Sequence, residues 1–272
     1  MGGFFIENMN KFERKPFIIA GPCSAEPGEQ IQISAREGLK RNIDAMRVSL
    51  WKPRTEPGGF EGLGEEGLPL LLMASQMGIT PATEVMLPQH AERVIDTVIK
   101  HSSDAKVIVW LGSRNQNQLL QREIGRVVAG EPRVILMIKN QPWRDERHWK
   151  GIAGFAIEGG ASHSQIMMIH RGFAPTGIEK DGLRNPPDFE MAMRVKRETN
   201  LPMIIDPSHI GGSVENVMRI AKDALDYEND GLKFDGLMVE VHPNPETAAT
   251  DKKQQLTWDQ FDQILEYGKV HR

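Results

Sequence analysis

Eight short apolar runs recur along this chain at intervals of roughly thirty residues. Parallel strands that are buried on both faces read as continuous apolar runs, and the segments between these runs are long enough for helical crossovers. Eight such units predict a (β/α)8 TIM barrel of the α/β class. The predicted strands are Phe17–Ala20, Ala45–Trp51, Gly78–Thr80, Val107–Leu111, Val134–Ile138, Ile166–Ile169, Met203–Ile205 and Leu237–Val241.

The segments between the runs show helix-like apolar spacing or a helix start signal. Thr257 precedes Trp258-Asp259-Gln260 in the pattern of a capping box, and Ser213 is a weaker N-cap candidate. The predicted helices are Pro27–Lys40, Leu68–Met77, Pro88–Lys100, Gln116–Ala129, Arg144–Ile157, Asp188–Thr199, Ser213–Tyr227 and Thr257–Tyr267.

The length of the chain fits one barrel. It has 272 residues, and a TIM barrel takes about 250 residues as a single domain. No Ser/Gly-rich linker, charge block or change in composition divides the sequence. We therefore expect one catalytic barrel over residues 1–272 with no appended regulatory domain. Feedback control would then come from a partner, a missing segment or the barrel surface.

Composition excludes several classes of protein. Hydrophobic residues make up 39% of the chain, and no run approaches the roughly 20 apolar residues of a membrane span. Met1–Lys15 carries charges and lacks a signal-like apolar stretch, so we expect a cytoplasmic protein. The net charge of −4 gives no overall attraction to nucleic acid or anionic membranes. An anionic ligand must therefore be held by a local basic cluster.

One glycine motif imitates a dinucleotide site. Residues 62–67 read Gly-Leu-Gly-Glu-Glu-Gly, and Glu84 lies where a ribose-binding acid would be expected. The glycines do not follow a predicted strand directly, however, and two glutamates would repel a pyrophosphate. A loop that leads into a helix explains the motif better than a nicotinamide site does.

Nearly every apolar run is followed by polar or reactive residues; Thr83 and Glu84, for example, follow the third run. The loops after the strands of a TIM barrel form one catalytic face. Basic residues are prominent within or just beyond five of the predicted strands, where burial is costly unless an anion pairs with them. Scattered surface charges are the alternative, but the pattern favours a site for phosphates and carboxylates. The residues are Arg47, Lys52, Arg54, Arg114, Lys139 and Arg171.

A second set of side chains could bind a metal. Cys23, His209, Glu240 and Asp251 offer a thiolate, an imidazole and two carboxylates at the mouths of the first, seventh and eighth strands. This mixture suits Mn2+, Fe2+, Co2+ or Zn2+ rather than Mg2+ or Ca2+. Taken singly, each residue also has an ordinary structural explanation, such as a small buried hydrophobe for the cysteine.

Several motifs, taken in order, resemble the type I 3-deoxy-D-arabino-heptulosonate 7-phosphate (DAHP) synthases, especially the short beta-type subgroup. The resemblance runs from about Phe17 to the C-terminal helix and implies condensation of phosphoenolpyruvate with erythrose 4-phosphate, the entry step to aromatic amino acids. The motifs are Gly21-Pro22-Cys23-Ser24, Arg47 with Lys52-Pro53-Arg54-Thr55, residues 60–67, Gly112-Ser113-Arg114-Asn115, His170-Arg171-Gly172, Asp206-Pro207-Ser208-His209 and Glu240-Val241-His242-Pro243.

The resemblance implies a role for each matched position. The metal positions match Cys23, His209, Glu240 and Asp251. The candidate catalytic residues are Lys52, His209 and Cys23, to which we add Glu84 because of its place at the end of the third predicted strand. The side that receives erythrose 4-phosphate matches Pro53, Arg54, Thr55 and Asp206. The phosphoenolpyruvate positions match Arg47, Lys52, Gly112, Ser113, Arg114, Lys139 and Arg171. A homo-oligomer is expected, and a regulatory domain could be separate or missing.

Two positions depart from the usual pattern of the family. Ser113 stands where Ala is common, and Asn140-Gln141 follow Lys139 in place of Arg-Gly. Neither departure removes a charge from the predicted site. Two other functions remain open on the sequence: 3-deoxy-D-manno-octulosonate 8-phosphate synthase, which has Asn where Pro53 stands, and a catalytically silent barrel that serves as a scaffold.

In the implied reaction the metal polarises the aldehyde of the sugar phosphate. Arg114, Lys139 and Arg171 neutralise the phosphate of phosphoenolpyruvate. Arg47 and Lys52 hold its carboxylate and can supply a proton to the developing alkoxide. We expect Glu84 to orient the attacking water.

Overall fold

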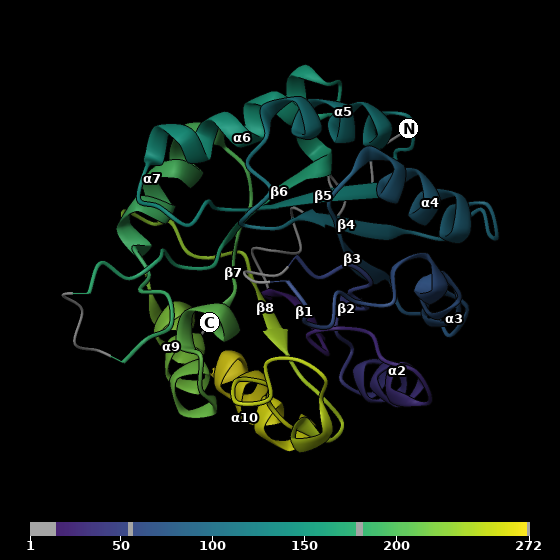
Figure 1. The fold of residues 1–272 in the computed structure, drawn as a ribbon. Helices are drawn as coiled ribbons and strands as arrows, with labels where there is room; N and C mark the ends of the chain where they lie inside the picture. Colours follow the sequence, from purple (N-terminus) through teal and green to yellow (C-terminus); the bar gives the residue numbers. More distant parts are fainter. Residues whose placement is uncertain (1–14, 54–56, 178–181, 271–272) are drawn as a thin grey trace.

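The computed structural model describes residues 15–53, 57–177 and 182–270. Its centre is a closed barrel of parallel strands in which neighbours in sequence are neighbours in space, from β1 round to β8 (Figure 1). This confirms the predicted TIM barrel. The strands are β1 Phe17–Gly21, β2 Ala45–Arg47, β3 Pro81–Val85, β4 Val107–Leu111, β5 Val134–Lys139, β6 Ile166–His170, β7 Met203–Ile205 and β8 Gly236–Glu240.

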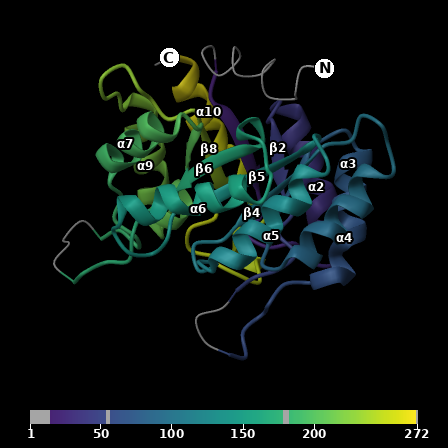
Figure 2. The same cartoon turned by 90° about the horizontal axis from the view of Figure 1, so that it is seen from above.

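Helices follow one another around the outside of the barrel (Figures 1 and 2). The long ones are α2 Gln30–Lys40, α3 Leu68–Gln76, α4 Pro88–Ile99, α5 Gln118–Ala129, α6 Glu146–Glu158, α7 Phe189–Thr199, α9 Val214–Asp226 and α10 Trp258–Val270. The short ones are α8 Pro207–Gly211 and the 3-10 turns η1 Gly64–Gly67, η2 His163–Gln165 and η3 Pro245–Thr247. No helix among the described residues is both long and apolar enough to cross a membrane.

The predicted helix starts at Ser213 and Thr257 are confirmed. The Ser213 hydroxyl accepts a hydrogen bond from the backbone N–H of Asn216 at 3.4 Å. At α10 the bonding is reciprocal: the Thr257 hydroxyl accepts from the Gln260 N–H, and the Gln260 side chain accepts from the Thr257 N–H. Each cap satisfies backbone donors that have no partner inside the helix.

Two predicted strands are wrong in their bounds. The third strand begins at Pro81, because Gly78 adopts a φ of +94° in the turn that ends α3 and the chain straightens only after it. Thr83 and Glu84 therefore lie within β3 rather than beyond it. β2 ends at Arg47, four residues earlier than predicted, because the following segment bonds to η1 and the loop ahead of it, through Gly64 N–H to Leu50 O and Lys52 N–H to Glu61 O.

The glycine motif of residues 62–67 has a structural role. An added Cβ on Gly62 would lie 1.9 Å from the carbonyl oxygen of Leu50, so the loop packs directly on the backbone that leaves β2. The segment then forms η1 and runs into α3, in agreement with the expectation of a loop that enters a helix.

Alternate residues of the strands point to opposite sides of the barrel wall. The inward set forms a compact core of its own, separate from the larger core between strands and helices. Its members are Phe17, Ile19, Ala45, Ala82, Ile108, Trp110, Ile135, Met137, Met167, Ile169, Ile204 and Met238. This apolar plug fills the barrel and ends just below the carboxyl ends of the strands.

Candidate functional site

The inward positions change from apolar to charged at the carboxyl ends of the strands. Five strands each lead to a buried ionisable side chain at their carboxyl end. In each case this side chain comes two residues after an inward apolar one, and two residues are one full period of a strand. These are Arg47 after Ala45, Glu84 after Ala82, Lys139 after Met137, Asp206 after Ile204 and Glu240 after Met238. The fold thus gathers on one level charges that are far apart in sequence.

Above this charged level lies a cavity of about 260 Å³. Five cationic side chains and only two carboxylates line it, which makes it suited to an anionic ligand. The lining residues are Lys52, Pro53, Glu84, Gly112, Ser113, Arg114, Lys139, Pro142, Arg171, Ala174, Arg184, Asn185, His209 and Asp251. Ten of them are site residues predicted from the sequence; Pro142, Ala174, Arg184 and Asn185 are not.

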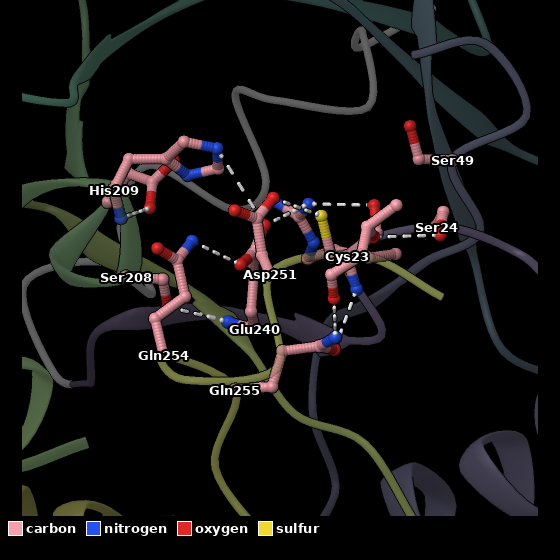
Figure 3. Close-up of polar contacts among 12 residues, drawn as sticks. Cys23, Ser24, Ser49, Ser208, His209, Glu240, Asp251, Gln254 and Gln255 are labelled. Carbon is pink, nitrogen blue, oxygen red and sulfur yellow. Dashed lines mark hydrogen bonds and ion pairs between the residues drawn. The ribbon is translucent and has the colours of Figure 1, made fainter. Parts of the chain in front are cut away.

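Cys23, Glu240 and Asp251 form the centre of the candidate metal site. One possible ligand atom from each lies within 4.8 Å of the others (Figure 3). His209 points toward this group, with Nε2 3.8 Å from Glu240 Oε1 and Nδ1 2.8 Å from Asp206 Oδ2. A carboxylate beside one ring nitrogen is the usual support for a histidine that binds metal through the other. The structure therefore brings the four predicted ligands together.

Neighbouring side chains hold these ligands in place. Gln254 donates to Glu240 Oε2 at 2.6 Å, and Gln255 accepts from the Cys23 backbone N–H at 2.9 Å (Figure 3). Arg184 donates to both Asp251 Oδ1 and Gln254 Oε1. Asp251 itself has a φ of +50°, a left-handed conformation that aspartate tolerates better than most residues. None of these three supporting residues was predicted.

The ligand chemistry fits a divalent transition metal. Burial raises the pKa of the Cys23 thiol to about 12, with the nearby Glu240 charge as a further cause. The thiol therefore stays protonated at neutral pH unless a cation binds beside it, and it donates to Asp251 Oδ2 at 3.2 Å. Burial also lowers the pKa of the His209 imidazole and so favours the neutral form that ligates metals. Thiolate, imidazole and two carboxylates together suit Mn2+, Fe2+, Co2+ or Zn2+.

Asp206 lies below the cavity and connects its two halves. One carboxylate oxygen accepts from Lys139 Nζ at 2.7 Å and also lies near His209 Nδ1, while the other caps α8 by accepting from the His209 N–H. The described cavity lining does not include Asp206, Arg47, Cys23 or Glu240, all of which are fully buried beneath it. Asp206 thus orients the groups that line the cavity.

The buried cations fall into two electrostatic classes. Burial lowers the pKa of Lys139, and it lowers the pKa of Arg171 to about 10. For Arg47 and Lys52 burial acts in the same direction, but the acidic groups around them outweigh it and their pKa values are raised. Lys139 and Arg171 are therefore the cations that gain most from an anionic ligand.

Glu84 lies on the inner surface of β3 and lines the cavity together with the cationic side chains. Its Oε2 accepts a 3.3 Å hydrogen bond from Trp110 Nε1. The side chain occupies space that a larger residue at position 112 would take, since a Cβ on Gly112 would lie 2.0 Å from Glu84 Oε1. Gly112 is thus the residue that leaves room for this carboxylate in the cavity.

The two departures from the family pattern have different consequences. Asn140 is buried and holds the loop after β6: its side chain donates to Gly172 O at 2.8 Å and accepts from the Arg171 backbone N–H at 2.7 Å. The Arg171 guanidinium is in turn held by Asn185 Oδ1 at 2.8 Å. The Ser113 hydroxyl is buried and has no hydrogen-bond partner among the described residues.

The loop after β2 is described only in part. Lys52 Nζ donates to Cys23 O at 3.0 Å, which places its ammonium group between the candidate metal ligands and the cavity. The Pro53 carbonyl accepts from Arg114 Nη1 at 3.2 Å, so this loop is tied to the loop after β4. Arg54 and Thr55, both predicted to bind substrate, lie outside the described residues.

Fold and site together define a TIM-barrel protein with a cation-lined cavity and a candidate metal site of thiol and carboxylate groups at the carboxyl ends of its strands. A sequence model of the family described as the DAHP synthetase I family matches residues 9–271. The chain belongs to this family, and is accordingly an enzyme of the transferase type. The resemblance inferred from the motifs is thereby confirmed.

Individual relatives agree with the family match. A phospho-2-dehydro-3-deoxyheptonate aldolase of Thermotoga maritima is 29% identical, over 93% of this chain and 68% of that protein. A crystal structure of a phospho-2-dehydro-3-deoxyheptonate aldolase (DAHP synthase) from Thermotoga maritima matches with a TM-score of 0.80 and 29% identity, over 94% of this chain and 69% of that one. A 2-dehydro-3-deoxyphosphooctonate aldolase of Methylococcus capsulatus is 26% identical, over 93% of this chain and 88% of that protein.

Proposed function

We propose that this protein condenses phosphoenolpyruvate with D-erythrose 4-phosphate and water, which gives 3-deoxy-D-arabino-heptulosonate 7-phosphate and inorganic phosphate. This is the reaction implied by the family. One observation carries the proposal: five cations line a cavity of about 260 Å³ directly beside the Cys23, Glu240 and Asp251 cluster. Two anionic substrates and a metal-assisted carbonyl reaction need such an arrangement.

Phosphoenolpyruvate would occupy the part of the cavity nearest β4, β5 and β6. We assign its phosphate to Arg114, Lys139 and Arg171 because these three cations line the cavity together. Its carboxylate would lie against Lys52 and Arg47. The Nη1 atom of Arg47 is buried and has no hydrogen-bond partner among the described residues, so it is available to an incoming anion.

A divalent metal, when bound to Cys23, His209, Glu240 and Asp251, would polarise the aldehyde oxygen of the sugar phosphate. Carbon 3 of phosphoenolpyruvate then attacks the aldehyde carbon, water adds at carbon 2, and phosphate leaves with cleavage of the carbon–oxygen bond. Lys52 Nζ can donate a proton to the developing alkoxide. We assign Glu84 to the attacking water, since its carboxylate lines the same cavity.

The length of the sugar phosphate is the main question of specificity. Pro53 lines the cavity, cannot donate a backbone hydrogen bond and has a fixed φ. We propose that, with Arg54 and Thr55, it forms a short pocket for a four-carbon aldehyde. Five-carbon arabinose 5-phosphate would have to fit one more carbon between the same two anchors.

The decisive experiment measures phosphate release by the purified protein with phosphoenolpyruvate and either sugar phosphate. We expect turnover with erythrose 4-phosphate, far slower turnover with arabinose 5-phosphate, and reversible loss of both rates on chelation. Comparable rates with the two sugars would refute the pocket assignment. The proposed reaction would be wrong if neither sugar gave turnover after Mn2+, Fe2+, Co2+ and Zn2+ had each been added back. That result would favour a catalytically silent barrel that serves as a scaffold.

Two variants test the orientation of the substrates. Lys139→Ala should mainly weaken the use of phosphoenolpyruvate, whereas Arg54→Ala should mainly raise the requirement for erythrose 4-phosphate. Loss of one cation from a desolvated phosphate typically costs about 2–5 kcal/mol, or roughly thirty-fold to several thousand-fold. If Arg54→Ala instead harmed phosphoenolpyruvate binding alone, the two substrates would lie the other way round.

Three further properties belong to the same proposal. We infer a cytoplasmic enzyme that assembles as a homo-oligomer, with a regulatory domain that is separate or missing. The location is inferred from the charged segment Met1–Lys15, and the other two properties from the resemblance of the sequence. Sedimentation of the purified chain tests assembly, because a monomer at micromolar concentration would contradict it.

A further inference from the structure

Trp110 occupies a central place in the site although it was not among the predicted site residues. It lies on the inner face of β4, is fully buried, and belongs to the apolar plug directly below the cavity. Its backbone pairs in register with Glu84 of β3 on one side and with Met137 of β5 on the other. The indole is thus the last apolar layer beneath the charged level.

Three ionisable groups contact this one side chain. The Arg47 guanidinium carbon lies 5.1 Å from the indole ring centre, and Lys139 Nζ lies 5.8 Å from it. Both distances are within the range of a cation–π interaction. At the ring edge, Nε1 donates to Glu84 Oε2 at 3.3 Å. The faces of the indole therefore attract cations while its one polar atom holds a carboxylate.

We propose that Trp110 is a positioning residue that holds Arg47 and Lys139 in orientation toward the anionic substrate while its N–H fixes Glu84. This inference rests on the proposed function, since it concerns the phosphoenolpyruvate end of that site. The substrate class it addresses is a small molecule that carries both a phosphate and a carboxylate.

The physical reason is that an aromatic ring attracts a cation without neutralising it. Arg47 and Lys139 already have carboxylate partners, Glu240 at 2.9 Å and Asp206 at 2.7 Å. A further carboxylate beneath them would cancel the charge that an anionic substrate needs. The quadrupole of the indole supplies part of the stabilisation lost on burial and adds no negative charge to these two ion pairs.

Two substitutions separate the ring from its N–H. Trp110→Phe keeps an aromatic face but removes the donor to Glu84, so phosphoenolpyruvate should bind nearly as in the wild type while kcat falls about ten-fold. Trp110→Leu removes the face as well, so the dissociation constant for phosphoenolpyruvate should also rise, by roughly three- to thirty-fold.

A buried tryptophan elsewhere provides the matched control. Trp258 has the guanidinium carbon of Arg41 5.1 Å from its ring centre and belongs to the core outside the barrel. Trp258→Leu should lower the melting temperature but leave the affinity for phosphoenolpyruvate and kcat per folded molecule unchanged. Trp110 fluorescence gives an independent signal, because the change on adding phosphoenolpyruvate should be largest in the wild type and reduced in Trp110→Phe.

The measurements are calorimetric titration with phosphoenolpyruvate alone and steady-state rates, with circular dichroism and thermal melts as checks of folding. Wild-type protein that fails to bind phosphoenolpyruvate would count against the proposed function itself. Wild-type binding with unchanged affinity in Trp110→Leu would overturn the role of the ring. If Trp110→Leu does not fold, Trp110→Phe still decides the role of the N–H, since an unchanged kcat there would overturn it.

Discussion

At the scale of single residues, Cys23 is a candidate metal ligand whose thiol keeps its proton in the absence of a cation. Its pKa of about 12 reflects burial without a metal, and its hydrogen bond to Asp251 links two candidate ligands to each other. A cation that binds there must displace the thiol proton. Metal binding should therefore release a proton and weaken as the pH falls.

We predict that Cys23→Ser lowers metal affinity by orders of magnitude, because it replaces the softest ligand of the set. Titration with Co2+ measures this directly, since a bound thiolate produces a charge-transfer band that the variant should lack. Ser24→Ala is the adjacent control: that hydroxyl bonds Thr250 at 3.0 Å, and its loss should leave the band intact. Equal Co2+ affinity in wild type and Cys23→Ser would exclude the thiol as a ligand.

A second prediction at this scale concerns pH. Burial lowers the pKa values of Lys139 and Arg171, the latter to about 10, so in the empty site these groups lose their charge earlier than ordinary side chains as the pH rises. Affinity for phosphoenolpyruvate should thus be flat near neutrality and fall as the pH rises through these lowered pKa values.

Calorimetric titrations with phosphoenolpyruvate between neutral pH and about pH 10 test this expected fall in affinity. This range lies below the ordinary lysine pKa of about 10.4. Lys139→Arg should move the fall to higher pH, because a guanidinium keeps its proton. A pH-independent affinity, or a fall that the arginine variant does not move, would contradict the assignment of Lys139 to the phosphate.

Sequence reasoning predicted the cavity-lining residues at the strand ends but missed Arg184 and Asn185. Lys139 and Arg171 stand at strand ends, where the barrel topology alone predicts convergence. Arg184 and Asn185 lie deep in the connection between β6 and α7, and only the folded path of that connection brings them to the cavity. Trp110 was missed for another reason, because an apolar residue inside an apolar strand carries no signal.

At the scale of elements, the connection between β6 and α7 depends on close contact between two of its parts. Gly172 has a φ of +76°, and an added Cβ would lie 1.9 Å from the carbonyl oxygen of Asn185. Gly172 O also accepts from Asn140, so this point ties β5, β6 and the distal part of the connection together. The position of Arg171 depends on that junction.

We predict that Gly172→Ala destabilises the fold by more than about 1 kcal/mol and raises the KM for phosphoenolpyruvate, since both conformation and space forbid a Cβ. Gly177→Ala in the same connection is the control. Its φ of +91° is similar, but an added Cβ there meets nothing within 4 Å among the described residues. Urea unfolding and steady-state rates compare the two; equal losses would mean that the contact with Asn185 has no importance of its own.

Strand bounds were the least predictable feature of the elements. Apolar content placed the third strand at Gly78–Thr80, yet Ile79 packs in the outer core from within a turn and the strand begins at Pro81. Hydrophobicity reports burial and not backbone conformation, so a buried turn residue reads like a strand residue. This error in strand bounds affected the candidate site, because Glu84 was expected beyond the third strand and instead points inward from it.

At the scale of the whole molecule, the regular spacing of the eight apolar runs was sufficient to predict the barrel. Each run supplies inward side chains to one core and outward side chains to another, and only a closed sheet surrounded by helices buries both. The charged level arises where the inward positions turn polar. Fold and site location could thus be predicted together, whereas the supporting contacts of Gln254, Gln255 and Arg184 required coordinates.

We predict that phenylalanine, tyrosine and tryptophan change the initial rate of this chain by less than the roughly five-fold that typical allosteric coupling produces. Allostery requires a second site whose ligand distinguishes two states, and we propose that this chain is a catalytic barrel alone. Initial rates at saturating and sub-saturating substrate, with each amino acid in turn, provide the test. Strong inhibition by any of the three would reveal a regulatory site on the barrel.

The burial of Cys23 allows transient local opening of the fold to be measured without an added label. Because the sequence holds a single cysteine and the fold covers it completely, an alkylating reagent can react only during moments when the corner between β1 and residues 251–255 opens. Each modified molecule then records one opening event, and the modification rate measures how often that corner comes apart. Ligands that occupy the closed form should lengthen the interval between openings in proportion to their saturation.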